Sequence, residues 1–395
     1  MRPRALSATV PDPLRQIGIG LALVTFLVGV YFLAFNGDAI SSDELFLFDA
    51  TESLARRGDM RMNYLNDVHA PQLLAEVKPP VADVEPLQPL LAVPLFRLAE
   101  ALPGIGLVHT VWLFNVLVTA LTAGVLFAYG LALDYRPRAA AIVALLYGVG
   151  TIAWPYSRTF FREPLFTLLA LLSVLLTLRL RLALSAGERP WGAAIALVVA
   201  FAGALFSKEA AFLLLPPLIV QAIPDRLASA RRARRAAVTL LVIGAIILAL
   251  LVIAASADSL FGVDTGRWSI MRRLEQVRDN LTQAGEGVLG YLVSPGRSLW
   301  VYSPVLLAGF FGWPWLIRQG RRREIAVPLV MLVTFVVGYA LVRGPEWYGG
   351  TGWGAASSVA GEAHPVRPAM DSAAQDERTG RGRRGTKTAR PPGRA

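Results

Sequence analysis

The stretch LVHTVWLFNVLVTALTAGVLFAYGLAL, residues 107–133, contains no Asp, Glu, Lys or Arg at any of its positions. About 20 consecutive apolar residues are enough for a helix to cross the hydrocarbon core of a bilayer. The whole chain has the same character, because 54% of its 395 residues are hydrophobic and only 17% are charged. These proportions predict an all-α protein with several membrane-spanning helices.

Further apolar runs flank this stretch on both sides. The first one is not followed by a small-residue cleavage site, so we interpret it as a retained helix rather than a signal peptide. The run at 209–223 gives the weakest prediction, because it is short and contains Pro216-Pro217. We predict nine spans, at about 17–35, 107–133, 139–156, 164–182, 191–207, 209–223, 236–257, 301–317 and 325–342.

Basic residues are distributed unevenly between the segments that join these spans. With residues 1–16 in the cytoplasm, the inner segments hold 17 Lys and Arg in 52 residues, and the outer segments hold 14 in 134. This bias follows the positive-inside rule and places two long loops, 36–106 and 258–300, on the outer side. The net charge of +11 therefore comes from short clusters between apolar runs, and a nucleic-acid partner is not expected. The chain has no cysteine, which excludes disulfides and thiolate metal sites.

The first outer loop contains SSDELFLFDATESLARRGDM, residues 41–60. Apolar side chains fall at helical spacing here, namely Leu45, Phe48, Thr51 (or Ala50) and Leu54. We predict an amphipathic helix over residues 44–57 that lies at the membrane surface, with Asp43 at its N-terminal edge. Two interpretations of the acidic pair stay open: Asp43 or Ser42 caps the helix, or Asp43 and Glu44 belong to a catalytic centre.

Charged side chains are also present in each of the remaining outer segments. They are Lys78 in AEVKPPV, Arg158, Arg162 and Glu163 in WPYSRTFFREPLF, Lys208 and Glu209 in FSKEAAFLLLPP, and Arg297, Arg343 and Glu346 near the last two spans. Charges so close to a membrane need partners. Each also has a structural interpretation: a solvated loop lysine, a pair between Arg162 and Glu163, or contact with lipid headgroups.

Carboxylates and cations at one membrane face suit a particular chemistry. A carboxylate can deprotonate an acceptor hydroxyl, and cations can stabilise a departing phosphate. The pattern indicates transfer from a lipid-linked phosphate donor. The alternatives are a transporter or lipid flippase, which would place ionisable residues near the bilayer midplane, and a non-catalytic partner protein. No glycine-rich phosphate loop follows a predicted strand, so nucleotide chemistry has no support.

The order of these motifs resembles that of the GT-C superfamily of polyprenyl-phosphate-dependent glycosyltransferases. The similarity is greatest to the glycosyltransferase family 39-like group of protein mannosyltransferases and aminoarabinose transferases, and it covers roughly residues 15–354. The stretches that carry it are SSDELFLFDATESLARRGDM, AEVKPPV, PLQPLLAVPLFRL, FREPLF, SKEAAFLLLPP, SPGRSLWVYSPVLL and EWYGGTGWG.

The resemblance implies a GT-C-like bundle in a bacterial plasma (inner) membrane, with its active site on the outer side. The donor would be a polyprenyl-phosphate sugar, and the acceptor a protein, glycolipid or polysaccharide hydroxyl. Asp43 would be the general base, Glu44 would support it or bind sugar, and Glu163 would orient the acceptor or a metal. Lys78 would contact the donor phosphate, with Arg158, Arg162 and Lys208 as further candidates.

Two departures from the family pattern affect these expectations. Some relatives place a metal-binding histidine in the later outer loop, but residues 258–300 contain none, so a divalent metal is possible without a specific ligand set. From Ala355 onward the chain lacks Leu, Ile, Phe, Trp and Tyr and carries eight Lys and Arg. We predict that 17–354 is the enzyme-like domain and that 355–395 is a disordered basic tail from a frameshifted or truncated reading frame, unless it is a genuine tail.

Overall fold

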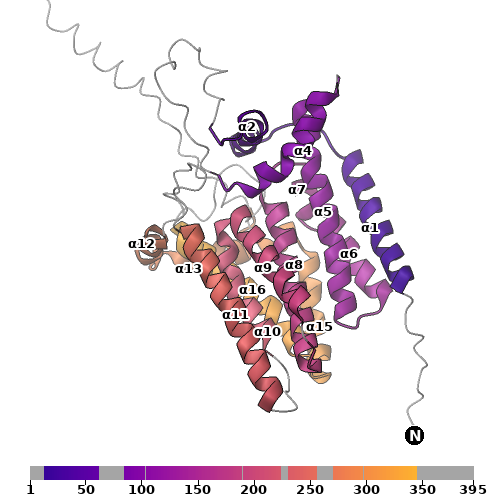
Figure 1. Cartoon of the computed structure of the whole chain (residues 1–395), viewed down its shortest axis with the longest axis vertical. Coiled ribbons are helices and arrows are strands. Elements are labelled where there is room, and N and C mark those ends of the chain that lie inside the picture. Colours follow the sequence, from indigo (N-terminus) through magenta and orange to yellow (C-terminus); the bar gives the residue numbers. More distant parts are fainter. Residues whose placement is uncertain are drawn as a thin grey trace, which may run out of the picture.

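The computed structural model describes residues 13–61, 84–102, 104–188, 190–223, 230–255, 270–296 and 298–344. Within these ranges every regular element is a helix, which confirms the predicted all-α class. Four helices are long and apolar enough to cross a membrane: α1 (Pro13–Leu33), α5 (Leu107–Ala132), α8 (Glu163–Ala186) and α16 (Arg323–Arg343). Figure 1 shows these helices side by side in one bundle.

The other predicted spans also coincide with helices, and all of these except the 26-residue α11 (Ala230–Ala255) are shorter or broken. They are α6 (Pro137–Gly150) with α7 (Ala153–Tyr156), α9 (Trp191–Ser207), the 3₁₀ helix η1 (Glu209–Leu214) with α10 (Leu215–Ala222), α11, and α14 (Leu299–Tyr302) with α15 (Val305–Arg318). Pro216-Pro217 lies in the first turn of α10, where a missing backbone N–H breaks no helical hydrogen bond. The proline pair therefore lies at the start of a new helix, α10, within the apolar run that was predicted as one span.

Two of the main core clusters lie against α5. One face of α5 packs on α1 and α6 through Leu27, Tyr31 and Ala144, and the other packs on α4 (Leu87–Ala101) through Phe96 and Trp112. A third cluster joins α8, α9 and α10. Large apolar side chains also remain on the outside of the bundle, as at α1, α9 and α11. Such faces suit contact with lipid hydrocarbon.

Segments that the charge pattern assigns to one side of the membrane contact each other. The turn after α5 meets the turn before α16, where the Tyr135 hydroxyl donates to Glu324 Oε2 at 2.6 Å. The Arg321 guanidinium lies 4.5 Å from the centre of the Tyr135 ring and pairs with Glu324. Both turns are predicted to be cytoplasmic. The predicted outer segments meet at the opposite end, where α2 and α4 lie in Figure 1.

The predicted loop helix exists as α2 (Ser42–Arg57), and Figure 1 shows it seen nearly end-on beside the end of the bundle. The predicted cap was wrong by a residue or two. Ser41 is the N-cap, and it forms a capping box in which Glu44 accepts from the Ser41 N–H. The buried stripe agrees with the predicted face at Thr51 and Ala50, but it otherwise contains Leu47 and Ala55, while Leu45, Phe48 and Leu54 are only partly buried. Glu44 lies on this same stripe and is completely buried.

Candidate functional site

The turn between α7 and α8 is held by three buried polar side chains from three other helices. Asn115 Nδ2 of α5 donates to the carbonyls of Thr159 and Phe161, both at 2.8 Å. Gln88 Nε2 of α4 donates to the Phe160 carbonyl at 2.6 Å, and Glu44 Oε1 of α2 accepts from the Phe160 N–H at 2.7 Å. Buried backbone groups need such partners, so these bonds fix the position of the turn.

Glu44 therefore connects α2 with a turn more than a hundred residues away. Its second oxygen, Oε2, accepts from the N–H groups of Ile40 at 2.7 Å and Ser41 at 3.1 Å. Burial raises the pKa of Glu44, while these backbone hydrogen bonds act in the opposite direction. Both carboxylate oxygens are engaged with the backbone, which favours a positioning role over the sugar contact implied by the family resemblance.

Glu163 and Lys208 form an ion pair in the interior. Lys208 Nζ lies 2.5 Å from Glu163 Oε1, and the side chains are 2% and 12% exposed. Lys208 follows the end of α9, and Glu163 begins α8. Burial lowers the pKa of Lys208, and the Glu163 carboxylate counteracts this effect. Lys208 is thus placed to hold Glu163 rather than to face a phosphate in solvent.

Arg162 also has a partner that the sequence did not indicate. It pairs with Glu85, not with its neighbour Glu163, and both side chains are about nine-tenths buried. Glu85 Oε1 also accepts from the Glu209 N–H at 3.2 Å. Glu85 thereby joins the start of α4 to the 157–163 turn and to η1. The one signal that could have found it is its place before Pro86 and the apolar stretch of α4.

Asp43 and Arg158 lie on the two elements that Glu44 joins. Asp43 is in the first turn of α2 and is partly buried. Arg158 is partly buried as well, and its Nη1 donates to the Ala34 carbonyl at 3.3 Å. No carboxylate among the described residues pairs with Arg158. Of the described candidate cations, Arg158 is therefore the one that is least committed to a structural pair.

The remaining candidates are divided between described and undescribed parts of the chain. Arg343 ends α16 and lies close enough to Lys208 for its charge to lower the pKa of that lysine. Lys78, Arg297 and Glu346 lie outside the described residues, as does the whole 355–395 tail. In the ranges that the structure describes, no cluster of three or more His, Asp or Glu could hold a metal ion.

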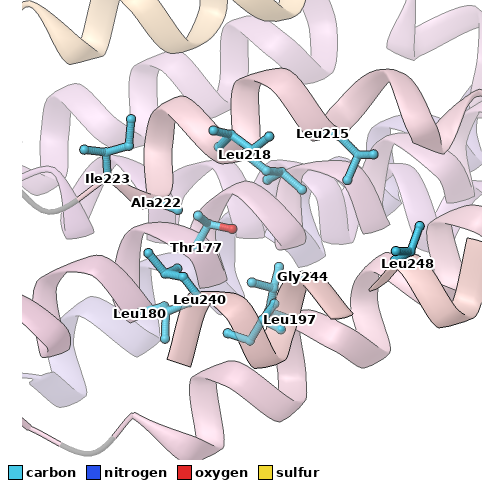
Figure 2. Close-up of a pocket in the computed structure, with 12 residues that line it drawn as sticks. Thr177, Leu180, Leu197, Leu215, Leu218, Ala222, Ile223, Leu240, Gly244 and Leu248 are labelled. Carbon is cyan, nitrogen blue, oxygen red and sulfur yellow. The ribbon is translucent and has the colours of Figure 1, made fainter. Parts of the chain in front are cut away.

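Two cavities lie near these elements. The smaller, of about 130 Å³, is bordered by Glu163 and by side chains of α5, α6, α7 and α8. The larger, of about 370 Å³, lies between α8, α9, α10 and α11, and Figure 2 shows its lining of leucine and isoleucine side chains around Thr177. The Thr177 hydroxyl already donates to the Ser173 carbonyl at 2.7 Å. This larger cavity is suited to hydrocarbon but offers no group for catalysis.

No protein-family model, curated protein or solved structure matches the chain. The likeness to the GT-C glycosyltransferases therefore depends on the quoted motifs alone. The geometry adds an independent observation, because four separate segments of the sequence meet through direct contacts at one end of the bundle. They contribute Glu44, Glu85, the neighbours Arg162 and Glu163, and Lys208.

Proposed function

We propose that the chain is an integral-membrane glycosyltransferase that moves a sugar from a polyprenyl-phosphate donor to an acceptor hydroxyl. The observation that carries the proposal is the 2.7 Å hydrogen bond between Glu44 Oε1 and the Phe160 N–H. It attaches α2, which has Asp43 in its first turn, to the turn that carries Arg158 and leads into Glu163 at the start of α8. A general base, a cation and a second carboxylate are thereby presented by two elements in direct contact.

The reaction that suits this arrangement is an inverting displacement. The Asp43 carboxylate takes the proton of the acceptor hydroxyl as its oxygen forms a bond to the anomeric carbon. The bond from that carbon to the phosphate oxygen breaks, and its electron pair leaves with polyprenyl phosphate. Arg158 compensates the charge that develops on the leaving phosphate, together with Lys78 from the undescribed part of the loop.

The buried pairs around the turn have a supporting role in this proposal. Glu163 orients the acceptor through the oxygen that Lys208 leaves open. Lys208 holds the Glu163 carboxylate in place through their buried ion pair and balances its charge. Arg162 and Glu85 fix the turn itself. Arg162 and Lys208 thus contribute to the geometry without direct contact with the phosphate.

The membrane setting is part of the proposal. We place about nine helices in a GT-C-like bundle across a bacterial plasma membrane, with residues 1–16 in the cytoplasm and the site at the outer face. The four long apolar helices, and the grouping of basic turns at one end, support this placement. The long carrier of the donor then stays in the bilayer while its sugar reaches the outer face.

A single substitution tests the assignment of the base. Membranes containing the chain are supplied with polyprenyl-phosphate sugars, and covalent transfer to protein, glycolipid and polysaccharide fractions is measured. We expect Asp43→Asn to lower the transfer rate by at least a hundredfold, which is the lower end for removal of a general base. The matched control is Asp38→Asn, an exposed aspartate five residues earlier whose carboxylate accepts from Asn36.

Two results would contradict the proposal. The first is transfer by Asp43→Asn at the wild-type rate and at normal protein level, which removes Asp43 as the base. The second is movement of an unmodified substrate across the membrane that depends on Asp43, with no covalent product. That result would favour the transporter alternative.

A further inference from the structure

Five of the nine residues that line the small cavity beside Glu163 carry a hydroxyl group, and most of the cavity surface is apolar. Its polar lining residues are Thr119 of α5, Tyr147 of α6, Thr151, Tyr156, Thr167 and Glu163 itself. The volume of about 130 Å³ is roughly ten times the space that one water molecule needs. The cavity therefore has room for several waters or for a hydroxylated part of a ligand.

Thr119 differs from the other buried helical threonines. The hydroxyls of Thr51, Thr110, Thr122 and Thr177 each donate to the carbonyl four residues earlier, at 2.7–3.0 Å. Thr119 is only 1% exposed, yet its Oγ1 has no hydrogen-bond partner among the described residues. A buried hydroxyl without a partner is unfavourable. Because Thr119 lines the cavity, a molecule bound there is a candidate partner for its hydroxyl.

Glu163 has an open acceptor on the same cavity. Its Oε1 is taken by Lys208, and its buried Oε2 accepts no hydrogen bond from the part of the chain that is described. Glu163 is the only charged residue among those lining the cavity, and the Lys208 ammonium group balances its charge. The hydroxyls of Thr151 and Thr167 already donate to backbone carbonyls at 2.7 Å, so within the described residues the unbonded groups are Glu163 Oε2 and Thr119 Oγ1. No cation among the lining residues would attract an anion.

We propose that this cavity binds an uncharged sugar ring, with ring hydroxyls donating to Glu163 Oε2 and bonding to Thr119 Oγ1. The inference rests on the proposed function. It restricts the substrate class to neutral, hydroxyl-rich sugars and excludes uronic acids and phosphorylated sugars. The ring belongs either to the donor or to a glycan acceptor, since both present the same hydroxyl chemistry.

Binding is measured without any transfer reaction, using the full chain in lipid nanodiscs. The probes are undecaprenyl phosphate carrying mannose, glucose, galactose or galacturonate, bare undecaprenyl phosphate, and the free methyl glycosides of the three neutral hexoses. Thr119→Val removes the hydroxyl and keeps the volume. Thr110→Val is the matched control, because Thr110 is a buried threonine of the same helix whose hydroxyl is already bonded to Gly106.

We expect Thr119→Val to raise the Kd of a neutral-sugar probe by about three- to tenfold, as for loss of one hydrogen bond, with no change for bare undecaprenyl phosphate. An effect confined to the lipid-linked sugars assigns the ring to the donor, and one confined to methyl glycosides assigns it to the acceptor. Thr110→Val should leave each Kd unchanged.

Three outcomes overturn the inference: equal affinity for bare and sugar-loaded carrier, a Kd insensitive to Thr119→Val, or preference for the galacturonate probe. The first two would mean that no sugar ring bonds to Thr119 in this cavity. A different result would show that the proposed transfer reaction is wrong while the sugar site is correct. A neutral sugar would then bind in a Thr119-dependent way without covalent transfer to any acceptor.

Discussion

Replacing Lys208 with methionine isolates the energetic role of the buried ion pair. Methionine keeps the length and the apolar stem of the side chain but removes the ammonium group. Glu163 would then carry a charge with its side chain only 12% exposed and no cation at 2.5 Å. Breaking a buried pair by removing one partner costs about 3–5 kcal/mol of unfolding free energy, because the remaining charge is uncompensated.

The matched control is Arg56→Met in α2. Arg56 contacts Glu52 and Glu100, but its side chain is 46% exposed. Solvent screening limits such surface pairs to about 1 kcal/mol or less. Thermal unfolding of both variants in detergent, followed by circular dichroism, provides the comparison. At about 1.2 °C per kcal/mol for a chain of 395 residues, we expect a loss in Tm of about 4–6 °C for Lys208→Met and about 1 °C or less for Arg56→Met.

A second substitution separates the effect of the uncompensated charge on stability from the effect of the altered side-chain shape. In the double variant Lys208→Met/Glu163→Gln the remaining group is neutral, so most of the lost stability should return. Equal Tm values for Lys208→Met and Arg56→Met would refute the argument that the pair is buried and mutually dependent. So would a double variant that is less stable than Lys208→Met alone.

Three further predictions concern the residues that position the turn. Burial raises the pKa of Glu44, so its contribution to stability is complete below about pH 4.5 and is lost as the pH rises through the folded-state pKa. Unfolding curves measured from pH 4 to pH 8 should therefore show that the stability advantage of wild type over Glu44→Gln decreases as the pH increases. Asn115→Leu leaves the Thr159 and Phe161 carbonyls unsatisfied and should cost about 2–4 kcal/mol in the same assay. Arg158→Gln should lower the rate of sugar transfer at least tenfold and change Tm by less than about 2 °C, which would distinguish it from the structural arginine Arg162.

Helix positions were predictable because they depend on local composition. Each apolar run of bilayer length became a helix or a pair of helices, and the amphipathic spacing after Asp43 became α2. Helix ends were less predictable. Ser41, Ser42 and Asp43 are all good capping residues, and the choice of Ser41 depends on Glu44 reaching back to the backbone at the same time.

The pairing of charges could not be predicted, because it is set by how distant segments pack. Nothing local indicates that Glu44 turns inward to Phe160, or that Glu85 takes Arg162 away from Glu163. Two neighbouring residues of opposite charge suggest, from the sequence alone, that they form an ion pair with each other. At the start of α8, however, Arg162 is the N-cap and Glu163 the first helical residue, and they find partners from different elements.

The cost of these buried charges argues that they serve more than stability. Well-packed apolar residues in place of a buried ion pair are often neutral or stabilising, and a membrane bundle has many such residues available. Here two buried pairs, Arg162–Glu85 and Lys208–Glu163, hold one turn, and one Glu163 oxygen stays unbonded within the described structure. In the proposed glycosyltransferase, an acceptor hydroxyl that donates to this oxygen would complete the site.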